Sequence, residues 1–112
     1  MVKQGQIIWT DFDPQIGHEQ KGRHPALVVS NKSFNGFSRF LVICPITNND
    51  KNHPFDVRLD YRTKTTGVVM CDQVKALDVS ARKFTIVEKA PDDILSIVLD
   101  ILSGFIEYDD DN

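Results

Sequence analysis

The sequence has few of the residues that bind metals or cross-link a small protein. Its 112 residues include only two cysteines, Cys44 and Cys71, too few for a disulfide framework or a cysteine-rich zinc site. The histidines stand at positions 18, 24 and 53, and no two of them are four residues apart, as they would be in a helical zinc site. A glycine-rich phosphate loop is also absent. We therefore expect no metal and no other cofactor, and two buried, reduced thiols.

Long apolar segments are missing as well. No run approaches the roughly 20 residues of a membrane-spanning helix, and the first five residues form no apolar stretch of signal-peptide length. The composition, 41% hydrophobic and 26% charged, is ordinary for a folded globular domain. We expect a single cytoplasmic domain that spans residues 1–112.

The charge is low overall and unevenly distributed. A net charge of −3 excludes a strongly basic nucleic-acid-binding protein. Seven of the 16 acidic residues fall in residues 91–112, which contain no lysine or arginine, so residues 1–90 carry 13 basic against 9 acidic side chains. A body with a net charge of +4 can hold a local phosphate-binding groove. The acidic tail, residues 107–112, is expected to be solvated.

Short apolar runs separated by turns dominate the first 90 residues. We expect strands near 7–12, 25–30, 40–46, 55–59, 67–71, 73–77 and 84–88, with one helical turn between Ser30 and Gly36. Pro45 interrupts the third run, which predicts an edge strand or a bulge there. Strands this short and close together favour a small barrel over about residues 4–90.

The last segment is different, because its apolar residues recur at helical spacing. We expect a helix over about residues 91–106, with Pro91 at its first position and two aspartates complementing the positive end of its dipole. Its broad apolar stripe is expected to pack on the barrel and to extend into a subunit interface. The stripe consists of Ile94, Leu95, Val98, Leu99, Ile101, Leu102, Phe105 and Ile106. The predicted fold class is therefore mainly β with a C-terminal α-helix.

Seven short motifs occur in an order and at spacings that resemble one family. They are Gly5-Gln6-Ile7-Ile8-Trp9, Asp11-Phe12-Asp13-Pro14, Gly17-His18-Glu19-Gln20, Pro25-Ala26-Leu27-Val28-Val29-Ser30, Cys44-Pro45-Ile46-Thr47, Thr65-Thr66-Gly67-Val68-Val69 and Cys71-Asp72-Gln73-Val74-Lys75. Over about residues 4–106 the chain is similar to the MazF/PemK (Kid, ChpB-like) toxins of bacterial type II toxin–antitoxin systems.

The resemblance implies a fold, an activity and partners. The fold would be an SH3-like barrel with a C-terminal helix, in a homodimer. The activity would be metal-independent, sequence-specific cleavage of single-stranded mRNA, which leaves a 2′,3′-cyclic phosphate and a 5′-hydroxyl and so inhibits growth. A cognate antitoxin protein would bind the dimer and block its RNA groove.

The family's central arginine directly precedes the proline of the second strand, and here that position holds His24, with Arg23 one residue earlier. Neighbouring residues on an extended chain point to opposite sides, so only one of the two is expected to face RNA. Arginine is a poor proton acceptor that suits phosphate binding, whereas histidine exchanges protons near neutral pH. We favour Arg23 and leave His24 open.

Other site residues follow from the same resemblance. Thr47 matches a catalytic-site threonine whose hydroxyl can donate to a phosphate oxygen, although a threonine here can also cap a turn. His18 matches a histidine of the Kid branch that can orient RNA or shuttle a proton. Asp72 matches an aspartate proposed there as a base, but the arginine two positions before it is replaced by Met70. That replacement puts the aspartate–arginine acid–base scheme in question.

Three further residues are expected to contact RNA. Gln20 and Asn48 carry side-chain amides that can bind a base edge. Phe55 can stack on a base, or it can be a core residue of an alternating strand.

Two other functions stay open at this point. The first is a non-enzymatic toxin of similar fold that poisons DNA gyrase, as the CcdB toxins do. The second is a catalytically impaired relative that still binds RNA or an antitoxin. This second alternative stays open because Met70 replaces an arginine and because Arg23 and His24 are displaced from the family's pattern. The segment from Arg23 to Pro25, together with Thr47, favours the endoribonuclease.

Overall fold

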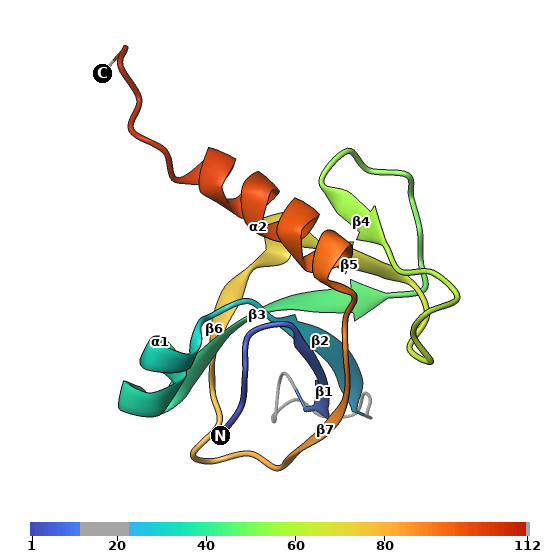
Figure 1. The fold of residues 1–112 in the computed structure, drawn as a ribbon, viewed down its shortest axis with the longest axis vertical. Coiled ribbons are helices and arrows are strands. Elements are labelled where there is room, and N and C mark those ends of the chain that lie inside the picture. The colour runs from blue at the N-terminus through green and yellow to red at the C-terminus, as the bar shows by residue number, and fades with distance from the viewer. Residues whose placement is uncertain (12–22, 112) are drawn as a thin grey trace.

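The computed structural model describes residues 1–11 and 23–111, and the structural statements that follow concern these residues (Figure 1). In the described residues, seven strands, one short helix and one 3₁₀ turn precede a long C-terminal helix. The elements are β1 (Gln6–Thr10), β2 (His24–Val28), α1 (Lys32–Phe37), β3 (Phe40–Thr47), β4 (Asp56–Arg58), β5 (Val68–Met70), the 3₁₀ turn η1 (Cys71–Gln73), β6 (Lys75–Asp78), β7 (Phe84–Lys89) and α2 (Asp92–Phe105).

The strands form one antiparallel, curled sheet in the order β4-β5-β3-β2-β1-β7, and β6 pairs with the first half of β3 (Figure 1). Helix α2 crosses one face of the sheet. The mainly β fold with a C-terminal helix is therefore confirmed. The strands expected near 25–30, 40–46 and 84–88 are present within two residues of the predicted limits.

Of the two alternatives predicted for Pro45, an edge strand or a bulge, the edge strand is wrong. Strand β3 lies inside the sheet, with β2 along one side. Its other side pairs with β6 as far as Ile43 and with β5 from Ile46 onward. Pro45 falls in the gap between these two partners, where the ladder is already interrupted, so a residue without an N–H is tolerated in a central strand.

Two apolar clusters fill the two faces of the sheet. Neighbouring residues such as Ile7 and Ile8 are both fully buried but belong to different clusters, because successive side chains of a strand point to opposite faces. This double burial explains why the strands read as continuous apolar runs. Helix α2 covers the cluster that contains Ile7, and it inserts Ile94 and Val98 there.

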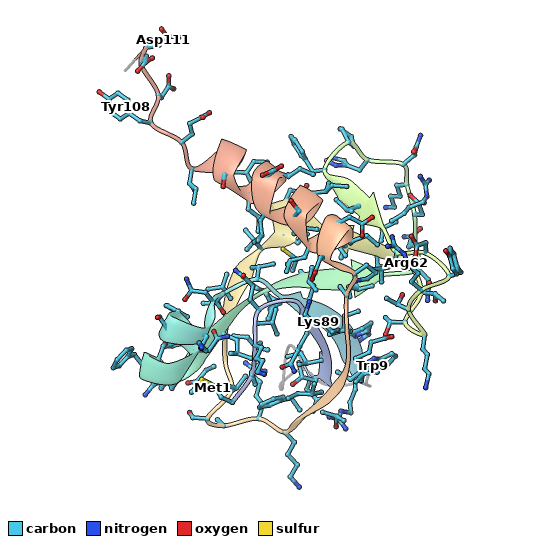
Figure 2. All side chains as sticks on the ribbon, viewed as in Figure 1. Met1, Trp9, Arg62, Lys89, Tyr108 and Asp111 are labelled. Carbon is cyan, nitrogen blue, oxygen red and sulfur yellow. The ribbon has the colours of Figure 1, made fainter. Side chains whose placement is uncertain are left out.

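Helix α2 begins one residue later than expected. Pro91 is the capping residue with an extended ψ of 145°, and the helix starts at Asp92. The packing predicted for the apolar stripe is confirmed over its N-terminal part, whereas Ile106 is exposed. The segment after it extends away from the body (Figure 2). None of the helices in the described residues is long and apolar enough to cross a membrane.

The two cysteines are both fully buried and both free, as expected. Their side chains contact each other, Cys44 from β3 and Cys71 from the start of η1. The hydrogen bond with Cys71, together with burial, raises the pKa of the Cys44 thiol. Both thiols are therefore part of the buried core.

Candidate functional site

A groove of about 450 Å³ opens where β1, β2 and β7 meet the loop between β4 and β5. Its lining combines one indole ring, two cations, two hydroxyls and one aliphatic side chain: Trp9, Arg23, Lys64, Thr65, Thr85 and Val87. Trp9 lies on the same side of the molecule as Arg62, which belongs to that loop (Figure 2). A surface with cations beside an aromatic ring can hold an anionic ligand that also carries a flat ring.

Arg23 is anchored at one wall of the groove. Its Nη2 donates to the backbone carbonyl of Trp9 and to the hydroxyl oxygen of Thr85, each at 2.9 Å. Trp9 and Thr85 face each other across β1 and β7, so both bonds direct the guanidinium toward the same spot. The Arg23 guanidinium carries further N–H donors on Nη1 and Nε, and these can bind a phosphate.

His24 is the first residue of β2 and is paired with Thr10 of β1. Both His24 and Arg23 are exposed. Strands β2 and β3 run antiparallel with Ala26 opposite Pro45, so the start of β2 adjoins the end of β3, where Thr47 lies. The start of β2, with Arg23 and His24, and the end of β3, with Thr47, thus lie at the same end of two neighbouring interior strands.

Thr47 is half-buried, and its hydroxyl oxygen accepts a hydrogen bond from the backbone N–H of Asn49 at 3.1 Å. The turn-capping role is therefore present, and the hydroxyl proton is still available for donation. Next to it, the Asn48 side-chain oxygen accepts from the Thr66 hydroxyl at 2.9 Å. The Asn48 amide N–H₂ is the part that can bind a ligand.

The loop that supplies Lys64 and Thr65 is fastened to β7 by Glu88. One carboxylate accepts from the backbone N–H of Lys64 at 3.0 Å, from that of Thr65 at 2.8 Å and from the Thr65 hydroxyl at 2.8 Å. Burial alone would raise the pKa of Glu88, but these donors stabilise the carboxylate and hold its pKa below the usual value. Glu88 therefore fixes one wall of the groove.

A second attachment joins the same loop to α2. Arg62 donates to Asp60 within the loop and to both carboxylate oxygens of Asp93, at 3.0 and 3.2 Å. The hydrogen bonds with Arg62 lower the pKa of Asp93. At the end of the loop, a Cβ on Gly67 would lie 2.3 Å from the carbonyl oxygen of Thr47. The loop is thus attached to β3, β7 and α2.

Asp72 and Phe55 lie elsewhere, at the far end of the β4–β5 hairpin. Asp56 pairs with Met70 at that end, whereas Arg58 pairs with Val68 at the end next to the groove loop. The Phe55 side chain is 40% exposed, and its ring meets that of Phe105 at right angles with centroids 4.9 Å apart. The Phe55 side chain is therefore not fully buried in the core, and one part of its ring packs against helix α2.

The predicted site residues thus fall into two groups, and two of them cannot be placed. His18 and Gln20 lie outside the described residues. Sequence reasoning missed Trp9, Lys64 and Glu88, although Trp9 ends the first quoted motif and Lys64 directly precedes another. Glu88 joins the groove through contacts with residues 23 and 24 positions away, and no local pattern signals such a contact.

Comparison with known proteins identifies the class of fold and then the family. The chain superposes on a crystal structure of a MazE–MazF complex from Deinococcus radiodurans with a TM-score of 0.85, 37% identity and coverage of 94% of this chain and 95% of that one. A family model described as the PemK-like, MazF-like toxin of type II toxin–antitoxin systems matches residues 3–106. The chain belongs to this family.

Two curated relatives are similar over most of the chain. Endoribonuclease PemK of Escherichia coli is 39% identical over 109 residues, which cover 94% of this chain and 82% of the relative. The endoribonuclease toxin MazF of Escherichia coli K12 is 40% identical over 81 residues, 72% of either chain. The family resemblance predicted from the seven motifs is confirmed.

Proposed function

We propose that the chain is the toxin of a type II toxin–antitoxin system and that it cuts single-stranded mRNA at specific sequences without a metal ion. The observation that carries this proposal is the anchored Arg23 guanidinium, which faces a groove beside Trp9 and the loop residues Lys64 and Thr65. The 39% identity to Endoribonuclease PemK supplies the reaction class. Because mRNA is the substrate, the protein acts in the cytoplasm.

The reaction is a transesterification within the RNA strand. The ribose 2′-oxygen attacks the adjacent phosphorus, so that a P–O2′ bond forms and the P–O5′ bond breaks. The 2′-hydroxyl gives up its proton, and the departing 5′-oxygen gains one. The products are a 2′,3′-cyclic phosphate and a 5′-hydroxyl.

The groove residues, and Thr47 and Asn48 next to the groove loop, have distinct roles in this scheme. Arg23 stabilises negative charge on the phosphate oxygens, and the Thr47 hydroxyl donates a hydrogen bond to the same phosphate. Lys64 binds a neighbouring phosphate, Trp9 stacks on a base, and the Asn48 amide contacts a base edge. His24, exposed next to Arg23, is the alternative for the central position.

The partners follow from the same family. A MazE–MazF complex has nearly the fold of this chain, with a TM-score of 0.85, so we propose that a cognate antitoxin binds this protein. We also propose that the toxin is a homodimer. The partly exposed end of the α2 stripe, where Phe105 is 39% and Ile106 85% exposed, provides apolar surface for a subunit contact.

One experiment tests the reaction. The purified protein is incubated with a long unstructured RNA in excess chelator, and the 5′ and 3′ ends of the fragments are mapped. We expect cleavage at one short sequence, with cyclic phosphate and 5′-hydroxyl ends. Intact RNA, cleavage that depends on added metal, or 3′-hydroxyl ends would each overturn the proposal.

The gyrase-poisoning alternative is not favoured, because the similar curated proteins are named endoribonucleases. A supercoiling assay with purified gyrase serves as its control, and no inhibition is expected. An impaired relative would leave the RNA intact in the cleavage assay but still retain it in a binding assay.

A further inference from the structure

The two buried cysteines, Cys44 and Cys71, take no part in the scheme for RNA cleavage. Strands β3 and β5 are antiparallel and pair with Ile46 opposite Val69. Two residues further along, backward in β3 and forward from β5, the same register places Cys44 opposite Cys71. A step of two residues returns to the same face of a sheet. All four side chains indeed belong to the apolar cluster that α2 covers, so the two thiols face each other across neighbouring strands.

The backbone around Cys71 shows which kind of antiparallel pair the two cysteines form. Met70 is extended, with φ of −92° and ψ of 93°, so strand geometry continues up to Cys71. The backbone N–H of Cys71 donates to the carbonyl oxygen of Phe55 at 3.2 Å, on the side of β4. This N–H therefore points away from β3, and Cys44 and Cys71 form a non-hydrogen-bonded pair. The Cα atoms of such a pair are about 4.5 Å apart, inside the range that a disulfide spans.

The two side chains already contact each other, and they differ in acidity. The hydrogen bond between them lowers the pKa of the Cys71 thiol, whereas the same bond together with burial raises the pKa of the Cys44 thiol. Cys71 is therefore the thiol that ionises first, and a thiolate is the form that attacks a disulfide. Its neighbour Cys44 is in place to complete the exchange.

We propose that Cys44 and Cys71 are a site of reversible oxidation to a cross-strand disulfide, with a small disulfide such as oxidised glutathione as the oxidant. The Cys71 thiolate attacks one glutathione sulfur, which forms a mixed disulfide and releases one reduced glutathione. The Cys44 sulfur then attacks the Cys71 sulfur and releases the second. The protein loses two hydrogen atoms, and oxidised glutathione gains them. Because both thiols are fully buried, the exchange takes place during folding or when this part of the sheet opens locally.

The disulfide closes a loop that contains much of the candidate site. The enclosed residues, 45–70, include Thr47, at the end of β3, and Lys64, on the wall of the groove. Closing a long loop restricts the unfolded chain and so stabilises the folded one. This oxidation does not depend on the proposed RNA cleavage, and a negative result leaves the cleavage scheme unchanged.

The test is refolding of the whole chain in a glutathione redox buffer. The reduced protein is unfolded in urea and diluted into a mixture of reduced and oxidised glutathione. Thiols that remain free are then alkylated in fresh urea. We expect a single chain that is lighter by two hydrogen atoms and carries no alkyl group. Trypsin should release residues 40–51 linked to residues 65–75, the two peptides that contain the cysteines. The Tm of the oxidised protein should exceed that of the reduced protein by roughly 5 °C or more.

Two matched controls keep one thiol each. Cys44→Ala and Cys71→Ala cannot form the internal disulfide, so neither should yield the linked peptides or gain Tm from oxidised glutathione. Dithiothreitol added to the oxidised wild type should separate the linked peptides and return Tm to the value of the reduced protein.

Three results for the wild type would overturn the proposal. The first is a refolded chain that keeps two free thiols. The second is a chain that carries glutathione, or is linked to another chain, in place of the internal disulfide. The third is an internal disulfide that leaves Tm unchanged or lowers it, which would show that the folded sheet has to distort to accommodate the bond.

Discussion

The two ends of the β4–β5 hairpin present opposite chemistry to a ligand. One end has the groove with Arg23 and Lys64, whose cations suit phosphates. The other end has Asp56 and Asp72 beside His53, and these carboxylates repel a phosphate. The difference teaches that a domain with a net charge of −3 can still present cations together at one place.

The two ends of the hairpin also differ in the contacts that fix their side chains in place. The groove wall at Lys64 and Thr65 belongs to a long loop that Glu88 and Arg62 attach to β7 and α2 through side chains. The other end is held mainly by the backbone, through the Phe55 N–H on His53 and the short turn η1 that carries Asp72. Mutations in distant side chains should therefore disturb the groove more than the other end.

The largest expected effect is on cleavage, from Arg23→Ala. Loss of a cation that stabilises the transition state should lower kcat by about 100-fold or more. The matched control is Arg39→Ala, since Arg39 is an exposed arginine at the other end of β3, where it pairs with Asp78. We expect Arg39→Ala to cut RNA at the parent rate, measured under single-turnover conditions.

His24→Ala decides which residue fills the central position. If Arg23 fills it, His24→Ala should retain most of the cleavage rate. A loss confined to His24→Ala would assign the role to His24 instead. Parent rates in both single variants would refute the assignment of the groove as the cleavage site.

Gly67→Ala should cause the next largest change, in stability. Gly67 has φ of +116°, and an added Cβ would lie 2.3 Å from the Thr47 carbonyl oxygen, so we expect a loss of about 2 kcal/mol or more. Gly104→Ala is the matched control, because nothing lies within 4 Å of its Cβ position in α2. This control should be neutral or stabilising by up to about 1 kcal/mol. Equal urea midpoints for both variants would contradict the close approach of Gly67 to the Thr47 carbonyl oxygen.

Much of the fold could be predicted from the sequence, because its information is local. The run around Leu27 and the helical spacing of Ile94 and Val98 depend only on neighbouring residues. The error at Pro45 arose because a change of strand partner, from β6 to β5, cannot be read from one segment. Pairing of this kind is a property of the whole sheet.

The site was predictable only in part. Arg23, His24 and Thr47 could be proposed as site residues because they lie within or beside motifs of the family. The contact of Glu88 with the Lys64 loop and the approach of His53 to Asp72 join residues 19 to 24 positions apart. Such contacts depend on how the hairpin and β7 pack, and no spacing rule in the sequence encodes them.

Glu88→Gln should have a smaller effect, which depends on pH. The carboxylate accepts three hydrogen bonds, and replacing it by an amide should cost about 1 kcal/mol at pH 7. The folded-state pKa of Glu88 is lowered, so its contribution is present above the ordinary value of 4.5 and is lost as the pH falls through the folded-state value. The difference in urea midpoint between wild type and variant should therefore shrink below about pH 4.5. A difference that grows on acidification would contradict this role.

The assignment of phosphate to the groove is tested most directly by the salt dependence of RNA binding. The probe is an RNA oligonucleotide that carries the mapped cleavage sequence with the cut nucleotide as 2′-deoxy, so that it binds but is not cut. Its Kd is measured from 50 to 400 mM salt for the wild type, Lys64→Ala and the control Arg39→Ala, and log Kd is plotted against log salt concentration. Removal of one phosphate contact should reduce the slope by about 0.7 for Lys64→Ala. Arg39→Ala should leave the slope unchanged, because Arg39 lies away from the groove, where it pairs with Asp78. An unchanged slope in Lys64→Ala, or an equal reduction in Arg39→Ala, would contradict the assignment of phosphate to the groove.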